Sequence, residues 1–285
     1  MNAKKPSKEQ LENRIRWFQH QANMSCYDER KARVAEFKKR VIPLLEALDT
    51  EESRQEALEE RMGLGLYLAH KHVARRTKAI VDEAFLQFHA VSDRCYDRIY
   101  KKGDATPRHF SMFVLARLEL AQIHNRLGEY EGAGQFAEEG IELLLSGRWR
   151  SQHHLELLIL GFCAAGDAFC GLEGSEMAAL KNYEQALSYC QAFIESGLAV
   201  AGLIEDWEED EREREAWNKQ AEDDCPWLAK AFNVEHVLRP VQRSIAKMTD
   251  SASEATRQFA KVLLNECNEW LVPNASEART EAKEA

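Results

Sequence analysis

Two neighbouring stretches of the chain repeat one pattern: a helix, a turn that contains glycine, and a second helix. The first stretch has Gly128 at its turn and Ala133 in the helix that follows. The second has Gly166 late in its first helix, with Ala179 and Tyr183 in the next one. Glycine ends helices because it tolerates the left-handed conformation, and small residues let two helix backbones approach closely. Because such units bury their apolar faces against one another in series, the pattern predicts a stack of helices with a surface for binding other molecules.

The remainder of the chain is predicted to be helical as well. It has six prolines in 285 residues, shows no alternating strand pattern, and is rich in Ala, Leu, Glu, Lys and Arg. Four amphipathic helices with short connections, between about residues 107 and 197, are expected to pack as two antiparallel hairpins. We predict an all-α fold of about ten or eleven helices, in which antiparallel hairpins stack as an array between flanking helices.

Capping residues predict where several helices begin. Ser7 followed by Gln10 resembles a capping box, which opens the first helix. Thr106 is followed by proline, a pairing that favours a helix start because proline fits the first turn. Ser251 with Glu254 three positions later resembles a second capping box, which is expected to open the last helix.

Glycines and length predict where helices end or break. The segment 50–100 is long for a single helix, so we expect a break near Gly63 and Gly65 or near Arg76. Gly197 is expected to cap the end of the fourth helix of the two hairpins.

These boundaries divide the chain into four regions. Residues 1–104 are an N-terminal helical region, 105–197 the helical hairpins, 198–272 C-terminal helices with an acidic segment, and 273–285 a polar tail that is predicted to be disordered. The acidic segment, residues 205–224, surrounds Trp207 and Trp217. It is interpreted either as a solvated helix whose tryptophans pack against the body, or as a contact surface for a basic partner with the tryptophans as anchors.

Composition excludes several classes of function. The net charge is −10 with no dense basic block, which disfavours binding to duplex nucleic acid through phosphate contacts. No uninterrupted apolar run approaches the length of about eighteen residues that spans a membrane. The polar N-terminus lacks an apolar signal core, so we expect a cytoplasmic protein. The seven cysteines are scattered and include no C-x-x-C pair, which indicates reduced, mostly buried thiols.

The two units resemble the tetratricopeptide repeat over about residues 107–196. In the first unit the residues that carry the resemblance are Ala121, Gly128, Ala133 and Phe136, and in the second they are Phe162, Gly166, Phe169, Ala179, Tyr183, Ala186 and Leu187. Three features depart from the family pattern, one of which is an extra residue between Phe169 and Gly174 in the second unit. Gly140 stands where the family prefers alanine, and the equivalent alanines 133 and 179 are 46 positions apart, whereas the family period is about 34. A generic helical bundle is the alternative.

The resemblance also implies a binding face. In this family the inner face of the first helices binds a peptide, and on this alignment the corresponding residues are Leu118, Gln122, Asn125, Arg126, Cys163 and Asp167. Family members that grip a peptide's terminal carboxylate place lysine and asparagine at such points, whereas this set has one cation and one carboxylate, so we do not expect that clamp here. We therefore expect a basic or amphipathic protein or peptide as partner, with no cofactor, no metal and no catalysis. The oligomeric state stays open.

A helical ribonuclease, or a regulator associated with one, is the alternative function. The pairs Arg117 with His124 and Arg148 with His153 resemble the arginine–histidine signature of the HEPN class, although a polar residue after the arginine is missing in both. That interpretation predicts that Arg117 with His124, or Arg148 with His153, is exposed and converges across a dimer, whereas packing predicts that His124 fills an aromatic position of the first unit. A third possibility is a sensor whose helical array binds a peptide or small ligand. The chain has no phosphate-binding loop, no dinucleotide fingerprint and no zinc-protease or serine-hydrolase motif.

Overall fold

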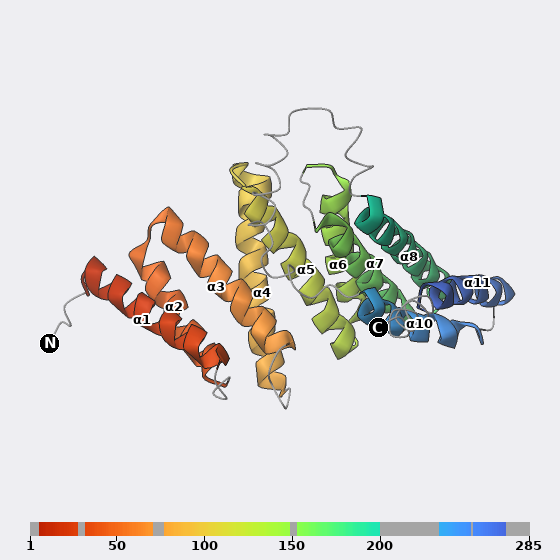
Figure 1. Cartoon of the computed structure of the whole chain (residues 1–285), viewed down its shortest axis with the longest axis horizontal. Helices are drawn as coiled ribbons and strands as arrows, with labels where there is room; N and C mark the ends of the chain where they lie inside the picture. Colours follow the sequence, from red (N-terminus) through yellow and green to blue (C-terminus); the bar gives the residue numbers. More distant parts are fainter. Residues whose placement is uncertain are drawn as a thin grey trace, which may run out of the picture. The chain divides into compact units, whose positions relative to one another are not determined.

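The chain is helical throughout the part that its structure describes. A computed structural model describes residues 6–27, 32–70, 77–148, 153–199, 234–251 and 253–271. These contain ten α-helices and one π-helical turn and no strand, which confirms the all-α prediction (Figure 1). The helices fall into two compact units, Met1–Ala105 and Thr106–Ala285, which we call the N-terminal and the C-terminal unit.

In the part that the structure describes, the N-terminal unit consists of four α-helices, each packed against the next, and a final π-helical turn. The elements are α1 (Lys8–Tyr27), α2 (Ala32–Leu48), α3 (Glu51–His70), α4 (Lys78–Tyr96) and η1 (Asp97–Lys102). One part of its core joins α1, α2 and α3 through Ile15, Phe18, Val41, Leu45 and Ala57. Consecutive packing of amphipathic helices is the outcome that the apolar periodicity predicts.

The predicted start of α1 is confirmed by its hydrogen bonds. The backbone N–H of Ser7 donates to Gln10 Oε1 at 3.0 Å, and the backbone N–H of Gln10 donates to Ser7 Oγ at 3.3 Å. Thr50 and Ser53 exchange the same pair of bonds at the start of α3, both at 3.1 Å. Each pair satisfies backbone donors that the first turn of a helix leaves free.

Of the two break points predicted in segment 50–100, the second agrees with the structure. Helix α3 runs through Gly63 and Gly65 without interruption. Thr77 is extended, with φ −82° and ψ 156°, and α4 begins after it. Gly65 has a packing role instead, because a Cβ there would overlap the ring of Phe88 on α4. The glycine thus marks a close approach of two helices.

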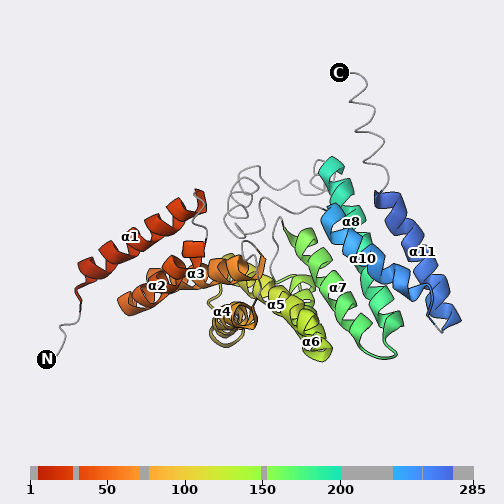
Figure 2. The same cartoon turned by 90° about the horizontal axis from the view of Figure 1, so that it is seen from below.

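The C-terminal unit contains two antiparallel hairpins followed by two further helices. The elements are α5 (Pro107–Leu127), α6 (Tyr130–Leu145), α7 (His154–Gly171), α8 (Glu176–Ala199), α10 (Val234–Met248) and α11 (Glu254–Leu271). Besides the hairpin pairs α5/α6 and α7/α8, helix α7 packs against both α5 and α6, and α10 packs against α7, α8 and α11 (Figure 2). This is a repeat-like helical array.

Two of the helix ends agree with the sequence prediction and two do not. Thr106 caps α5 with proline in the first turn, and Gly128 ends it in the left-handed conformation with φ 78°. Gly197 does not cap α8, which continues to Ala199. Helix α11 is capped by Ser253, whose Oγ accepts the backbone N–H of residue 256 at 3.4 Å, so the cap predicted at Ser251 is wrong. Two serines compete for this position, and the path of the chain into α11 decides between them.

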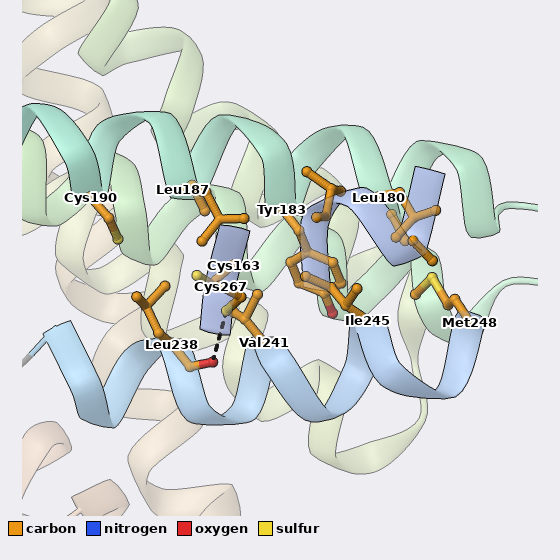
Figure 3. Packing of buried hydrophobic residues seen from close by; sticks show 14 of the residues in the cluster. Cys163, Leu180, Tyr183, Leu187, Cys190, Leu238, Val241, Ile245, Met248 and Cys267 are labelled. Carbon is orange, nitrogen blue, oxygen red and sulfur yellow. Dashed lines mark hydrogen bonds between the residues drawn. The ribbon is translucent and has the colours of Figure 1, made fainter. Parts of the chain in front are cut away.

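The core of the C-terminal unit is shared by α7, α8, α10 and α11. Figure 3 shows Leu180, Tyr183 and Leu187 of α8 facing Leu238, Val241, Ile245 and Met248 of α10, with Cys163 of α7 and Cys267 of α11 beside them. A Cβ at Gly166 would overlap the Tyr183 ring, so this glycine makes room for a completely buried tyrosine. The boundary predicted at residue 198 therefore does not separate the helices on its two sides, because α10 and α11 complete the core of the hairpins.

Helix α7 is, by length and composition, apolar enough to cross a membrane, the one such helix among the described residues. More than half of it (56%) is buried inside the unit, however, where it packs against α5, α6, α8 and α10. Glu156 and Asp167 also lie within it. Its apolar composition is accounted for by its central place in the core.

Candidate functional site

Five of the six residues predicted on the inner face of the hairpins line one groove between α5 and α7. These are Gln122, Asn125 and Arg126 of α5 and Cys163 and Asp167 of α7. Tyr130, Leu160 and Ala164 complete the lining, and the groove has a volume of about 360 Å³. Three- and four-residue spacing places each set on one side of its helix. We call this surface the α5–α7 groove.

A side chain of α5 is tied to the backbone of α7 along this groove. Asn125 Nδ2 donates to the carbonyl oxygen of Ala164 at 2.9 Å. Asn125 Oδ1 is buried and has no hydrogen-bond partner among the described residues. Arg126 donates to Gln122 Oε1 at 3.3 Å within α5. The bond from Asn125 fixes the distance between the two helices that form the walls.

Leu118 does not belong to the groove, although the alignment places it there. It is 1% exposed. A Cβ at Gly140 of α6 would lie 3.3 Å from its Cδ2, and one at Gly161 of α7 would lie 3.5 Å from it. Leu118 shares a helix face with Gln122, but one turn earlier the neighbouring helices cover that face. Its predicted role in partner binding is therefore corrected to core packing.

Asp167 is held in place by a buried tyrosine from the next helix. Tyr183 donates its hydroxyl to Asp167 Oδ1 at 2.6 Å, and Cys170 Sγ lies 3.2 Å from the same hydroxyl. Burial raises the pKa of Tyr183, so the hydroxyl stays protonated and donates. Neighbouring apolar atoms raise the pKa of Asp167, while the tyrosine hydrogen bond opposes that shift. The residue remains exposed along the groove, which limits the effect.

A second hollow adjoins the α5–α7 groove and was not predicted from the sequence. It has a volume of about 380 Å³ and extends from the ends of α7 and α8 to the C-terminal end of α10. Tyr130 and Asp167 line both cavities. The Tyr130 ring lies against Gly171, where a Cβ would overlap it. We call this second cavity the α10 hollow.

Both residues of the first arginine–histidine pair, Arg117 and His124, pack against aromatic rings. The Arg117 guanidinium lies 5.0 Å from the ring centres of Phe113 and Phe136, and its Nε is 3.0 Å from a carboxylate oxygen of Glu139. The His124 ring packs on Phe136 with centroids 5.0 Å apart. This is the aromatic packing position that the repeat pattern predicts for His124. Both residues thus surround an aromatic ring instead of facing a substrate.

In the second arginine–histidine pair, the arginine lies at the surface and the histidine in the interior. Arg148 is exposed, whereas His153 is 8% exposed and its Nδ1 lies 3.2 Å from the carboxylate of Glu156. The exposed and converging geometry that the nuclease interpretation requires is therefore not present within this unit. No group of three or more His, Cys, Asp or Glu side chains among the described residues could hold a metal ion.

The acidic segment with Trp207 and Trp217, interpreted either as a solvated helix or as a contact surface, lies outside the described residues, as does the polar tail. Comparison with known proteins finds no matching family model, no matching curated protein and no matching solved structure.

Proposed function

We propose that the chain is a non-catalytic interaction module, an adaptor or regulator that binds a segment of a partner protein in the α5–α7 groove. The observation that carries this proposal is the convergence of Gln122, Asn125, Arg126, Cys163 and Asp167 on one groove between two non-consecutive helices. The packing of α5 on α7, in addition to the two hairpins, supports the tetratricopeptide-like interpretation of the array.

The chemistry of the lining favours a protein segment over a small apolar ligand. Arg126 and Asp167 put opposite charges on the two walls, with amide groups on α5 and the apolar Leu160 and Ala164 on α7. A basic or amphipathic segment complements such a surface because it offers both an apolar face and hydrogen-bond donors. The proposal requires no cofactor, membrane or nucleic acid, and assigns the module to the cytoplasm.

The test is a pull-down with the full chain and a variant in which the groove is altered at three positions. Gln122→Ala, Arg126→Glu and Asp167→Lys change both walls at side chains that are not themselves buried. Because Asp167→Lys also removes the acceptor of the buried Tyr183 hydroxyl, thermal unfolding of the variant is compared with that of the wild-type chain. We expect the variant to lose a near-stoichiometric protein partner that the wild-type chain retains. The matched control is Glu138→Lys, a charge reversal on the exposed side of α6. Equal recovery of the partner by all three proteins would refute the proposal.

A further inference from the structure

The α10 hollow carries an excess of negative charge. Its charged lining consists of Asp167, Glu176 and Asp250 against one cation, Lys247. Among the described residues none of these four forms an ion pair within 4.0 Å, and Asp167 is the only one with a hydrogen bond from a side chain, that of Tyr183. The charges of Asp167, Glu176 and Lys247 all act on the Cys170 thiol, whose pKa is raised to about 11, chiefly by burial. These three charges therefore lie near one another.

The spacing of these carboxylates suits an organic cation and not a metal ion. No three of the described acidic, histidine or cysteine side chains come close enough to ligate one metal. A guanidinium or ammonium group carries its own hydrogen donors on a long apolar stem, so it can bond to one carboxylate and be attracted by others farther away. Asp167 is ready for this contact because Tyr183 already orients its carboxylate.

The hollow also offers apolar contact beside its charges. Met248 of α10 lies at one side, and the Tyr130 ring, packed on Gly171, lies where the hollow meets the α5–α7 groove. Because Tyr130 and Asp167 line both cavities, the groove and the hollow adjoin one another at these two residues. A protein segment that enters the groove can thus continue into the hollow.

We propose that one segment of the partner protein occupies the groove and the hollow together, and that it places an arginine or lysine side chain against Asp167 at their junction. Glu176 and Asp250 attract the same cation from farther away, and Lys247 opposes it. This inference rests on the proposed function, because it assigns the chemistry of the partner for the same surface. Tyr183 is a positioning residue that acts through Asp167.

The experiment begins with a selection of displayed random peptides on the full chain. We expect the selected peptides to share one arginine or lysine within an otherwise apolar pattern. The affinity of one such peptide is then measured by fluorescence anisotropy. Asp167→Asn keeps the shape of the side chain and is expected to weaken binding on the order of tenfold. Lys247→Met is expected to tighten binding severalfold, and the exposed Glu173→Gln, outside both cavities, is the matched control.

A peptide in which norleucine replaces the arginine or lysine completes a double-mutant cycle between that side chain and Asp167. It should bind the wild-type chain as weakly as the parent peptide binds Asp167→Asn, and the two changes together should cost no more than either alone. Unchanged thermal unfolding of each variant shows that the fold is retained.

The outcomes separate this inference from the proposed function. Peptides that bind but are insensitive to Gln122→Ala with Arg126→Ala would refute the groove as the binding surface, and so would a selection that yields no binder. Peptides that depend on these two residues but carry no cation, or ignore Asp167→Asn, would overturn the cation site alone. Concentration-dependent self-association that Asp167→Asn abolishes would show that a second copy of the chain is the occupant, which also overturns it.

Discussion

The two units use their charged side chains differently. In the N-terminal unit cations and carboxylates pair between helices: Lys38 of α2 lies 2.6 Å from Glu60 of α3, and Arg61 of α3 lies 2.9 Å from Glu46 of α2. In the C-terminal unit the charges of the α10 hollow have no such partners among the described residues. Ion pairs between helices help to hold the helices together, whereas charged side chains without an ion-pair partner are available to bind another molecule. The comparison indicates a structural role for the interhelical ion pairs of the N-terminal unit, and it agrees with the proposal that the charges of the α10 hollow bind another molecule.

The packing around Gly166 of the C-terminal unit differs from that around Gly63 of the N-terminal unit, and this difference predicts the largest effect. Gly166→Ala would drive a Cβ into the Tyr183 ring, which is completely buried and has no room to move. We expect a loss of about 3 kcal/mol in the stability of the C-terminal unit, the upper end of the usual cost of overpacking. Hydrogen exchange of α7 and α8 backbone amides in the full chain measures it.

The matched control is Gly63→Ala in the N-terminal unit. Its new Cβ would lie 3.3 Å from Lys38 Nζ, the end of a flexible side chain, so helix propensity should dominate and stabilise α3 by up to about 1 kcal/mol. If both substitutions had the same sign, the proposed contrast in packing would be wrong.

The second effect concerns the hydrogen bond that orients Asp167. Tyr183→Phe removes a 2.6 Å bond to a carboxylate from within the core. We expect a loss of about 2 kcal/mol in stability, typical of hydrogen bonds to charged groups, together with weaker binding of a cationic peptide. Chemical denaturation measures the loss of stability, and fluorescence anisotropy on the same variant measures the peptide affinity. Stability loss without any change in peptide affinity would remove Tyr183 from the binding mechanism.

The third effect tests the interhelical ion pairs of the N-terminal unit. Arg61→Met removes contacts to Glu46 and Gln87, both at 2.9 Å, while keeping much of the apolar stem. The guanidinium is about one-fifth exposed, so solvent screens the pair and we expect a loss of only about 1 kcal/mol. The difference from wild type should shrink in 1 M NaCl, because salt screens the pair. A loss that does not depend on salt would mean that packing of the stem matters more than charge.

The smallest effect is the pH dependence of Asp167. Its pKa is raised in the folded protein, so between the unfolded and the folded pKa the native state binds more protons and stability falls as pH rises. Asp167→Asn should therefore be as stable as wild type or slightly more so at pH 7, by less than about 0.5 kcal/mol because the residue is exposed. The difference should vanish below about pH 3, where the carboxyl is protonated in both states because the pH is well under its unfolded pKa of about 3.9. A variant less stable than wild type at pH 7 would contradict this sign.

Most of the α5–α7 groove could be predicted from the sequence, and the exceptions show why the rest could not. The resemblance of the two units to the tetratricopeptide repeat implied Gln122, Asn125 and Arg126 on the first helix and Cys163 and Asp167 on the third, and three- and four-residue spacing keeps each set on one side of its helix. Leu118 has the same spacing but is covered by α6 and α7, which no periodicity within α5 reveals.

The α10 hollow could not be predicted at all. It joins Tyr130 to Lys247 and Asp250, which lie more than a hundred positions later in the chain. The bond between Asp167 and Tyr183 likewise crosses from one helix to the next. Such neighbours share no local pattern, because they meet only through packing.

The sequence alone determined the helical class, the amphipathic faces and most helix starts, since a 3.6-residue period and capping hydrogen bonds are local properties. Only the tertiary structure decided which faces stay open. It covered Leu118, kept α8 helical through Gly197, placed α10 beside α7 and left three carboxylates around one hollow. The physical reason is that exposure and pairing of a side chain depend on which other helices reach it.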